Sequence, residues 1–520
     1  MRSLISVYNK KGIVDFARSL SKLGWEIITT GGTYKYLRSA KIKSIPVEKI
    51  TDEPEIFDGR VKTISYKIAA GILFDRSSKM HNREMKKLRL QPIDMVVCNL
   101  YPFSLTIARK HSLEEAIEMI DIGGVTALRA AAKNYKNVIV ICDSYDYQKI
   151  INEILLTGDV SLDNRSKLAY KAFQTISIYD ASISEYLAKK FGFGANLNLS
   201  FSNGIQLRYG ENTHLSGWYY RKEDADNLSL SKFKKLRGKE LSFNNILDIS
   251  SCIDTLSELG KDPSCVVVKH TNPSGASTAK SVEEAYKKAW HGGDPLAAFG
   301  GIVAVNRMVD KKLSLEMLRE GKFFEVLIAP QITKSALSAL SERKNLIILI
   351  NANLRRPKIK SGDDYKFVRG GILRQDFDSK KINSRDLKVV TIKKPTNKQL
   401  EDMLFAWKIV KVSKSNAVAI VKNQTLIASG VGQQDRKEAC RLAVFKAIDT
   451  DRGKSSETPK GAAAASDGFF PFADGPEILI KAGIKAIIQP GGSKRDQETI
   501  DLCNKYNVAM AFTATRAFRH

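Results

Sequence analysis

The stretch that decides the fold lies near the start of the chain, where residues 4–33 read LISVYNKKGIVDFARSLSKLGWEIITTGGT. Its first four residues, 4–7, form an apolar run that predicts a short strand. Apolar residues then recur at helical spacing from Ile13 to Leu23, and Gly24 is a typical helix stop. Residues 25–28 predict a second strand. A strand, a helix and a strand in this order favour a parallel sheet covered by helices.

The same alternation of strand-like and helix-like segments continues to about residue 190. Further strands are expected at 95–100 and 138–142, and a long helix from about 165 to 191. Residues 192–200 are rich in Gly, Asn and Ser, which is typical of a linker. Since ligands of open parallel sheets bind beyond the carboxyl ends of the strands, we expect a binding site at that edge.

We place a domain boundary in this linker, with a first domain at 1–195 and a second at 196–520. The second domain also mixes strands and helices, and residues 417–421 and 425–429 predict a hairpin around a short turn. No tandem repeat is evident along the chain. The fold class expected from the residues is therefore α/β, in two parts.

Composition and charge narrow the classes of partner. The 520 residues include 83 Lys or Arg and 56 Asp or Glu, and the formal net charge of +27 favours anionic partners. The basic residues are spread along the chain and no nucleic-acid-binding motif is present, so phosphorylated small molecules explain the charge at least as well as nucleic acid. A solvated basic surface without any such partner is the alternative interpretation.

The sequence predicts neither a membrane span nor a metal centre. No apolar run approaches the roughly 20 residues that a membrane helix needs, and the start of the chain lacks the apolar stretch of a signal peptide. The six cysteines have no Cys-x-x-Cys spacing, so neither a zinc site nor a redox pair is expected. We therefore expect no catalytic metal and a location in the reducing cytoplasm.

The first part carries groups suited to an anionic ligand at the expected edge of the sheet. Thr29–Thr33 follows a strand and precedes a helix, so it could cradle a phosphate, although a Gly-Gly turn alone is more often structural. Gly59–Thr63 places two cations beside a hydroxyl, and Asn99–Tyr101 ends a strand. Asp121–Val125 is a second glycine-paired loop, and Lys133 closes the helix after it. A Tyr, an Asp and two Lys around one crevice could supply proton transfer and oxyanion stabilisation.

In the second part the strongest candidate for a catalytic centre is Lys269-His270-Thr271-Asn272-Pro273. Residues 265–268 predict a buried strand that delivers Lys269 and His270 at its end, and Asn272–Gly275 is expected to turn the chain away. A lone His is more often structural than catalytic. His nevertheless transfers protons near neutral pH, and a Lys-His pair that leaves an apolar strand into a turn is a less common arrangement.

Further loops of the second part have the composition of binding segments. Residues 430–436 stand at a strand-to-helix junction, a geometry that favours anions. Residues 466–472 place an acid beside three aromatic rings, which suits a flat heterocycle. The segments 208–212, 294–301 and 516–520 also combine cations, glycines or aromatic rings.

These motifs, in this order, closely resemble one family: the bifunctional enzymes of the last two steps of purine biosynthesis, 5-aminoimidazole-4-carboxamide ribonucleotide (AICAR) formyltransferase and IMP cyclohydrolase. The resemblance spans Ser6 to His520. It rests on Gly-Arg-Val-Lys-Thr, Cys-Asn-Leu-Tyr-Pro-Phe, Asp-Ile-Gly-Gly-Val-Thr, Ala-Ala-Ala-Lys-Asn, Lys-His-x-Asn-Pro and Ser-Asp-x-Phe-Phe-Pro-Phe.

The resemblance implies a fold, ligands and an assembly. It implies a first domain with a methylglyoxal-synthase-like parallel sheet that closes the purine ring, and a second built from two cytidine-deaminase-like α/β modules without zinc. The implied ligands are AICAR, formyl-AICAR, IMP and the cosubstrate 10-formyltetrahydrofolate. The implied assembly is a homodimer with formyltransferase sites at the subunit interface, and neither a membrane nor a nucleic acid is an expected partner.

The resemblance also implies roles for individual residues. Lys269 and His270 would manage protons during formyl transfer, and Asn416 would contact the formyl oxygen. The groups implied for cyclisation are Lys62, Tyr101, Asp121 and Lys133. The implied substrate contacts are Ser6, Lys10, Thr30, Gly31, Gly32, Thr33, Arg60, Thr63, Asn99, Gly123, Gly124, Arg208, Tyr209, Gly300, Arg436 and Arg516. The implied folate contacts are Phe299, Asp467 and Phe470.

The chain departs from the family pattern at a few positions. Ser65 and Tyr66 stand where His and Pro usually follow Leu, and Tyr8 and Asn9 stand where Ser and Asp are usual. These positions border the expected cyclohydrolase site, so one alternative is a formyltransferase whose cyclohydrolase is weak or altered. Another, from a different class, is a basic nucleotide- or RNA-binding protein without catalysis.

Overall fold

The alternation of strands and helices at the start of the chain folds into one parallel sheet, as the sequence predicts. Its strand order is β3-β2-β1-β4-β5, and every neighbouring pair is parallel. Because β1 lies between β2 and β4, the strand order reverses at β1. The strands are β1 (Arg2–Val7), β2 (Glu26–Thr29), β3 (Ile45–Pro46), β4 (Met95–Asn99) and β5 (Ile139–Ile141).

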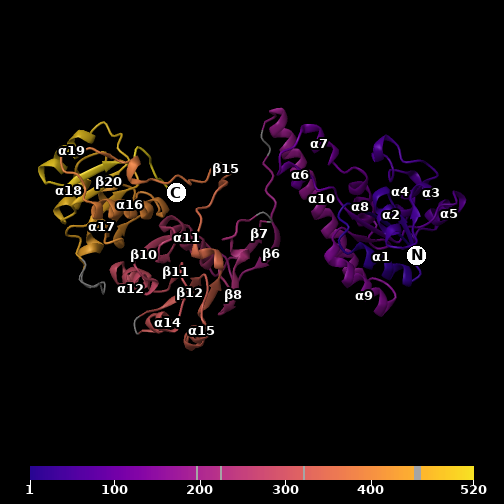
Figure 1. Cartoon of the computed structure of the whole chain (residues 1–520), viewed down its shortest axis with the longest axis horizontal. Coiled ribbons are helices and arrows are strands. Elements are labelled where there is room, and N and C mark those ends of the chain that lie inside the picture. Colours follow the sequence, from indigo (N-terminus) through magenta and orange to yellow (C-terminus); the bar gives the residue numbers. More distant parts are fainter. Residues whose placement is uncertain (195–196, 223–224, 320–321, 450–457) are drawn as a thin grey trace. The chain divides into compact units, whose positions relative to one another are not determined.

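The chain divides into two compact units, Met1–Ser200 and Phe201–His520 (Figure 1). The expected boundary between residues 195 and 196 lies outside the described residues, and the division falls at the end of the predicted linker. The computed structural model describes residues 1–194, 197–222, 225–319, 322–449 and 458–520.

Helices connect the strands of the first unit and cover its sheet. The helix predicted between the first two strands buries Ile13, Phe16, Ala17 and Leu20, and Gly24 follows it with a left-handed φ of 79°. The helices are α1 (Ile13–Lys22), α2 (Gly31–Ser39), α3 (Glu48–Thr51), α4 (Tyr66–Leu73), α5 (Lys79–Lys87), α6 (Phe103–Ile107), α7 (Leu113–Glu118), α8 (Gly123–Lys133), α9 (Tyr147–Thr157) and α10 (Leu162–Phe191), with 3-10 turns η1 (Phe57–Gly59) and η2 (Ser144–Asp146).

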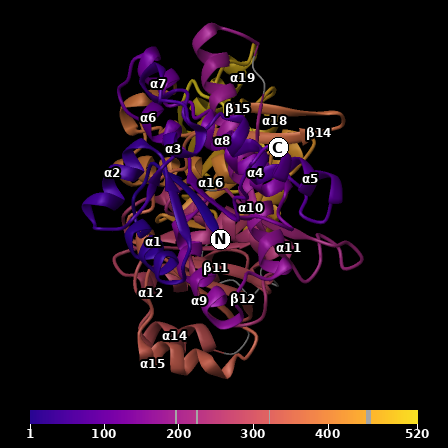
Figure 2. The same ribbon diagram turned by 90° about the vertical axis from the view of Figure 1, so that its right-hand side faces the viewer.

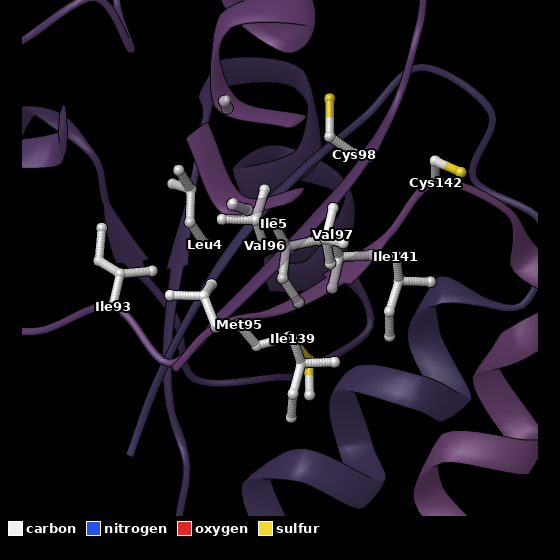
Figure 3. Packing of buried hydrophobic residues seen from close by; sticks show 14 of the residues in the cluster. Leu4, Ile5, Ile93, Met95, Val96, Val97, Cys98, Ile139, Ile141 and Cys142 are labelled. Carbon is white, nitrogen blue, oxygen red and sulfur yellow. The ribbon is translucent and has the colours of Figure 1, made fainter. Parts of the chain in front are cut away.

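The core of the first unit consists of the strand side chains and the apolar faces of these helices. Leu4 and Ile5 of β1 lie among Val96 and Val97 of β4 and Ile139 of β5 (Figure 3). Each of these side chains is at most 1% exposed. Since the strands are buried on both faces, their sequences are continuously apolar, and that is the signal that predicts them.

The second unit contains one sheet of twelve strands with the order β16-β21-β20-β19-β17-β18-β10-β9-β11-β12-β13-β8. The strands are β8 (Lys234–Arg237), β9 (Ser264–Lys269), β10 (Asn272–Thr278), β11 (Gly301–Val305), β12 (Phe324–Ala329), β13 (Ile347–Ile350), β16 (Lys388–Val389), β17 (Val418–Lys422), β18 (Thr425–Gly430), β19 (Ala463–Ser466), β20 (Ala486–Gln489) and β21 (Ala509–Phe512). Two separate hairpins pair β6 (Ser202–Gln206) with β7 (Trp218–Arg221), and β14 (Asp363–Val368) with β15 (Gly371–Asp376).

The helices of the second unit follow the same alternation. In both views α14 and α15 lie side by side (Figure 1 and Figure 2). The helices are α11 (Phe243–Leu259), α12 (Val282–Gly292), α13 (Pro295–Ala298), α14 (Lys311–Leu318), α15 (Lys334–Ala339), α16 (Asn397–Val412), α17 (Arg436–Ile448), α18 (Asp474–Lys481) and α19 (Asp496–Lys505), with 3-10 turns η3 (Leu230–Lys232), η4 (Leu340–Glu342), η5 (Ala352–Arg355) and η6 (Ser384–Asp386).

The twelve-stranded sheet consists of two α/β modules that repeat one plan. From the middle outwards, the order β10-β9-β11-β12-β13-β8 matches β18-β17-β19-β20-β21-β16, and β10 pairs with β18 where the modules meet. The first helix of each module, α11 or α16, begins with a capping box, formed by Ser242 in one and Thr396 in the other. The sequence shows no evident tandem repeat, and the shared plan becomes visible only in the order of the strands.

The structure corrects the expected turn after Lys269. Asn272–Gly275 does not turn the chain, because Asn272 begins β10 and pairs directly with Lys269 of β9. The turn is the two-residue loop His270-Thr271, with left-handed φ values of 54° and 62°. A tight loop of this kind suits the right-handed twist of the flanking strands, and it places His270 at the tip of a hairpin.

The described residues offer neither a membrane span nor a cluster of metal-ligating side chains. None of the helices there is long and apolar enough to cross a membrane. Within the same ranges, no group of three or more His, Cys, Asp or Glu side chains could hold a metal ion. The six cysteines are buried and unpaired.

Candidate active sites

A cavity of about 660 Å³ opens at the carboxyl edge of the first unit's sheet, and we call it the crevice. It lies where the loops after β1, β2 and β4 meet the starts of α2 and α8, at the reversal of strand order where such sheets bind ligands. Most of the residues predicted for the first part line it: Ser6, Lys10, Thr30, Gly32, Thr33, Arg60, Lys62, Thr63, Asn99, Tyr101, Asp121, Gly123 and Gly124.

One end of the crevice is a cradle formed by the start of α2 and the end of β1. The Ser6 and Thr30 hydroxyl oxygens lie 2.9 Å apart, and the Thr33 hydroxyl lies 3.2 Å from both the backbone nitrogen and the carbonyl oxygen of Val7. Lys10 Nζ donates to the Val7 carbonyl and lies 3.4 Å from Thr33 Oγ1. Burial, and then the neighbouring Lys62 charge, lowers the pKa of Lys10. A lysine and two hydroxyl groups beside a helix N-terminus suit a phosphate group.

The same crevice also holds groups that can move protons. Lys62 Nζ lies 3.5 Å from the Tyr101 hydroxyl, at the limit of a hydrogen bond. Asp121 Oδ1 accepts a 2.6 Å hydrogen bond from the backbone N–H of Gly124. Burial raises the pKa of the Asp121 carboxyl, although the N–H donors and Lys62 oppose that rise. A cation beside a phenol and a carboxyl of raised pKa can serve general acid-base chemistry.

Tyr179 of α10 supports the loop that carries Asp121, and no motif in the sequence singles this tyrosine out. Its hydroxyl accepts the Asp121 backbone N–H at 2.8 Å and donates to the Met119 carbonyl at 2.6 Å. Burial raises the pKa of Tyr179 to about 12, so the phenol stays protonated and keeps both roles. Its position 58 residues after Asp121 hides the contact from any local motif.

Asn99 holds the loop after β1 rather than presenting a free amide to the crevice. Its Oδ1 accepts the backbone N–H groups of Tyr8 and Asn9 at 2.7 and 2.9 Å, and its Nδ2 donates to the Asn9 carbonyl at 2.9 Å. The Tyr8 ring lies at the crevice, edge-on to Tyr101 with centroids 5.6 Å apart. Tyr8, where the family pattern has a small residue, therefore adds an aromatic wall.

Some predicted residues of the first part lie outside the crevice. Lys133 ends α8 ten residues after Gly123, about 15 Å along the helix axis, and lines a different hollow with Tyr170 and Phe173. Gly31 begins α2 but does not line the cavity. Within this chain Lys133 therefore lies away from the other three groups, because the helix carries it from the crevice, and its role in ring closure stays a prediction.

The Ser65-Tyr66 departure also lies outside the crevice. Ser65 caps α4 by accepting the Lys67 backbone N–H at 3.3 Å, and the Tyr66 side chain is 66% exposed. Ser65 and Tyr66 are absent from the lining of the crevice, so neither replaces a lining group.

In the second unit the hairpin turn presents Lys269 and His270. Lys269 Nζ donates to the Phe299 carbonyl at 2.8 Å, which ties the turn to the loop before β11. In that loop Gly300 has a left-handed φ of 76° and donates its N–H to Phe323 at 2.8 Å. The Phe299 ring is 52% exposed and packs against Phe323, so it can form part of a ligand wall.

Asn416 stands on a loop that a buried network holds in place. Arg436 Nη2 donates to Asn416 Oδ1 at 2.6 Å, and Arg436 Nη1 contacts Asp467 and Ser466. Ser415 Oγ donates to the other Asp467 oxygen at 2.6 Å. The Arg436 and Asp467 side chains are 7% and 0% exposed, so both support Asn416 from behind rather than face a ligand. An amide carries two N–H groups, and Asn416 Nδ2 uses one on the Gln434 carbonyl at 3.1 Å, which leaves a second to donate.

The hairpin turn and the Asn416 loop are joined within one chain. Asn272 Oδ1 accepts the backbone N–H of Lys414 at 2.9 Å, two residues before Asn416. Asn272 Nδ2 donates to the His270 carbonyl at 2.9 Å. One asparagine side chain therefore links the two segments that the sequence singled out.

The remaining predicted residues fall into exposed and buried groups. Arg208 is exposed and stacks on Tyr209, 5.1 Å from the ring centroid, and Arg516 is exposed and stacks on Phe518 at 4.6 Å. Phe470 is only 1% exposed and belongs to the core of the second module. The Phe470 ring is enclosed by core side chains, and its folate contact stays a prediction. Its neighbours Phe469 and Phe472 are 43% and 48% exposed.

Comparisons with known proteins match both parts of the chain. A family model described as AICARFT/IMPCHase bienzyme matches residues 131–446, and one described as MGS-like domain matches residues 12–126. A curated protein of Acetivibrio thermocellus, named bifunctional purine biosynthesis protein PurH, is 47% identical over 100% of this chain and 99% of its own. Proteins of that name from Ruminiclostridium cellulolyticum and Caldicellulosiruptor saccharolyticus are each 45% identical over the same shares. A solved structure named Crystal structure of ForH is 32% identical, covering 35% of this chain and 97% of its own, at a TM-score of 0.32.

Proposed function

The chain belongs to the AICARFT/IMPCHase bienzyme family, and we propose that each of its two activities resides in one unit. The enzyme catalyses the last two steps of IMP synthesis, formyl transfer to AICAR and closure of formyl-AICAR to IMP. The MGS-like match at 12–126 lies in the first unit, which supports assigning the closure to the crevice. Formyl transfer is then assigned to the second unit and its Lys269–His270 turn.

Ring closure requires the carboxamide nitrogen of formyl-AICAR to attack its own formyl carbon. We assign the substrate phosphate to the cradle of Lys10, Thr30 and Thr33. Lys62 and Tyr101 then lie where an oxyanion develops on the formyl oxygen, and Asp121 takes the proton from the attacking nitrogen. Loss of water from the resulting carbinolamine gives IMP. A single crevice that holds the cradle and the Lys62–Tyr101 pair is the observation that carries this assignment.

Formyl transfer requires the amine of AICAR to attack the formyl carbon of a formyl folate, which we take to be 10-formyltetrahydrofolate. The amine is a weak nucleophile, so its proton must be removed while the oxyanion is stabilised. We assign proton removal to His270 and oxyanion stabilisation to Lys269 and the remaining N–H of Asn416. Tetrahydrofolate leaves when its nitrogen takes up the proton that His270 removed from the amine. The Asn272 bridge between the two segments supports their joint action.

We further propose that the enzyme acts as a homodimer in the cytoplasm. Three predicted ligand residues of the second unit, Arg208, Phe299 and Arg516, are exposed, which fits a site that a second subunit completes. Six buried, unpaired cysteines fit a reducing compartment. Sedimentation over a range of protein concentration tests the dimer, and a monomer that retains full formyl transfer would refute the shared site.

Product analysis tests the division of labour. The full chain is incubated with AICAR and 10-formyltetrahydrofolate, and the products are separated from those of spontaneous cyclisation. We expect IMP from the unmodified enzyme. His270→Ala should abolish formyl transfer and still close supplied formyl-AICAR, whereas Tyr101→Phe should slow closure by about 10²-fold and leave transfer intact. Equal loss of both steps in either folded variant would contradict the assignment.

A further inference from the structure

The His270–Thr271 turn has a backbone geometry that the Thr271 side chain does not favour. Both residues have left-handed φ values, 54° and 62°. This region is uncommon for residues other than Gly, and although Asn, Asp and His adopt it more often than most, a β-branched residue such as Thr271 is a clear outlier there. Such a turn persists only where the surrounding structure imposes it. Something outside the turn must therefore hold it.

Four backbone groups of the turn are fixed by three side chains. Asp248 of α11 accepts both N–H groups, from His270 at 3.2 Å and from Thr271 at 2.6 Å. Ser251, one turn along the same helix, donates to the Thr271 carbonyl at 2.7 Å. Asn272 donates to the His270 carbonyl at 2.9 Å. Only Asp248 contacts both residues of the turn, and as a carboxylate it forms the stronger, charge-assisted kind of hydrogen bond.

The second module repeats the same device at a place that carries none of the predicted site residues. Asp402 of α16 accepts the backbone N–H groups of Asn423 and Gln424 at 3.0 and 2.6 Å. Those two residues form the β17–β18 turn, with left-handed φ values of 54° and 52°. Asp402 and Asp248 each stand six residues after the residue that caps their helix. The carboxylate that binds the turn is therefore a feature of both modules. Only in the first module does that turn carry a proposed proton-transfer residue, His270.

We propose that Asp248 is a positioning residue for formyl transfer, because its carboxylate imposes the left-handed turn that aims His270 and Lys269. This inference rests on the proposed role of His270. Asp248 acts through the backbone of the turn and needs no contact with the substrate. A shift of about 1 Å in a reacting group can reduce a rate about 10²-fold, so small relaxation of this turn has a large catalytic effect.

The test compares Asp248→Asn with the matched variant Asp402→Asn in the full chain. An amide keeps one acceptor oxygen but turns an N–H₂ group toward the other backbone N–H, so either turn loses one hydrogen bond. We expect Asp248→Asn to lower kcat of formyl transfer about 10- to 100-fold with KM values changed less than about threefold. Closure of supplied formyl-AICAR should be unchanged. Asp402→Asn should lower the unfolding temperature to a similar extent and leave both activities unchanged.

A rescue experiment separates positioning from general destabilisation. Glycine adopts left-handed φ without strain, so Thr271→Gly in the Asp248→Asn background should recover at least about a third of the lost kcat. Asp248→Glu, which keeps the charge but moves the carboxylate by one methylene, should lower kcat as well and serves if the amide variant does not fold. Equal kcat losses in the Asp248→Asn and Asp402→Asn variants, or no rescue by glycine, would overturn the proposal. Full formyl transfer by His270→Ala would instead refute the proposed function on which it rests.

Discussion

Replacing Asp467 with Asn distinguishes a carboxylate that supports the Asn416 loop from one that contacts folate. The family resemblance implies a folate contact, whereas the Asp467 side chain is 0% exposed in the described structure. It pairs with Arg436 and accepts the Ser415 hydroxyl at 2.6 Å. The amide has the same shape and keeps an acceptor oxygen, so the substitution removes the charge and little else.

The expected loss of stability follows from the burial of both Arg436 and Asp467. Removing one charge of a buried pair strands the other, which typically costs about 3–5 kcal/mol. Because Asn retains one hydrogen bond, and because Arg436 also donates to Ser466 and Asn416, we expect a loss near 3 kcal/mol in the second unit. Such a loss lowers the equilibrium between folded and unfolded forms by roughly a hundredfold.

Urea unfolding of the full chain measures the loss of stability, and formyl-transfer kinetics measure the effect on kcat and KM. We expect an earlier transition of the second unit and a lower kcat, since the loop that carries Asn416 is loosened, with a small change in KM for 10-formyltetrahydrofolate. Asp94→Asn is the matched control, because Asp94 is a buried acceptor in the first unit that binds Arg76 at 2.9 Å. It should destabilise the first unit and leave formyl transfer unchanged. Unaltered unfolding with a raised KM for the folate alone would show that Asp467 contacts the folate.

Three further predictions concern single residues. Asp121→Asn should reduce ring closure by at least about 10²-fold. The pKa of Asp121 is raised in the folded protein. The stability that this carboxyl contributes is therefore fully present below its unfolded pKa near 4, and it is lost as pH rises through the folded pKa. In thermal unfolding, the Asn variant should be more stable than the parent at pH 7 but not at pH 3. Tyr179→Phe leaves the Met119 carbonyl and the Asp121 N–H unpaired, so it should cost about 1–3 kcal/mol and lower kcat of ring closure only, which parallel assays of both steps check. Phe470→Ala should cost about 3–5 kcal/mol in urea unfolding, whereas Phe472→Ala, at a half-exposed ring, should cost under about 1 kcal/mol; comparable losses would contradict the core placement of Phe470.

The sequence predicted the first unit well because its signals are local. The strands at 4–7, 95–100 and 138–142 are continuous apolar runs, and the helix from Ile13 has a single apolar face, so each element can be identified without its partners. The residues that follow these strands then meet at one edge of the sheet, which is why most of the predicted contacts line the crevice. Lys133 and Gly31 do not line it, and Lys133 lies farther away because the motif places it in α8 without showing that only the start of this helix reaches the crevice.

The second unit was harder to predict because its plan depends on distant contacts. The capping boxes at Ser242 and Thr396 are visible in the sequence, yet only the sheet order shows that they open equivalent helices of two repeated modules. Asp248 lies 22 residues before His270, and no local pattern joins them. The turn was misplaced for a related reason: Asn-Pro-Ser-Gly is typical of a turn, whereas here a carboxylate on a neighbouring helix imposes the left-handed backbone on His270 and Thr271.

The sequence by itself determined the family, the two activities and the identity of the candidate groups, because all of these are encoded in short motifs of fixed order. Only the tertiary structure decided which of those groups are exposed and which are buried. Arg436, Asp467 and Phe470 belong to the same motifs as exposed neighbours, and burial separates them, since a charge or ring enclosed on all sides acts through packing and hydrogen bonds rather than through contact with substrate. A motif specifies which chemical groups the chain carries, and the fold specifies which of those groups are exposed and which are buried.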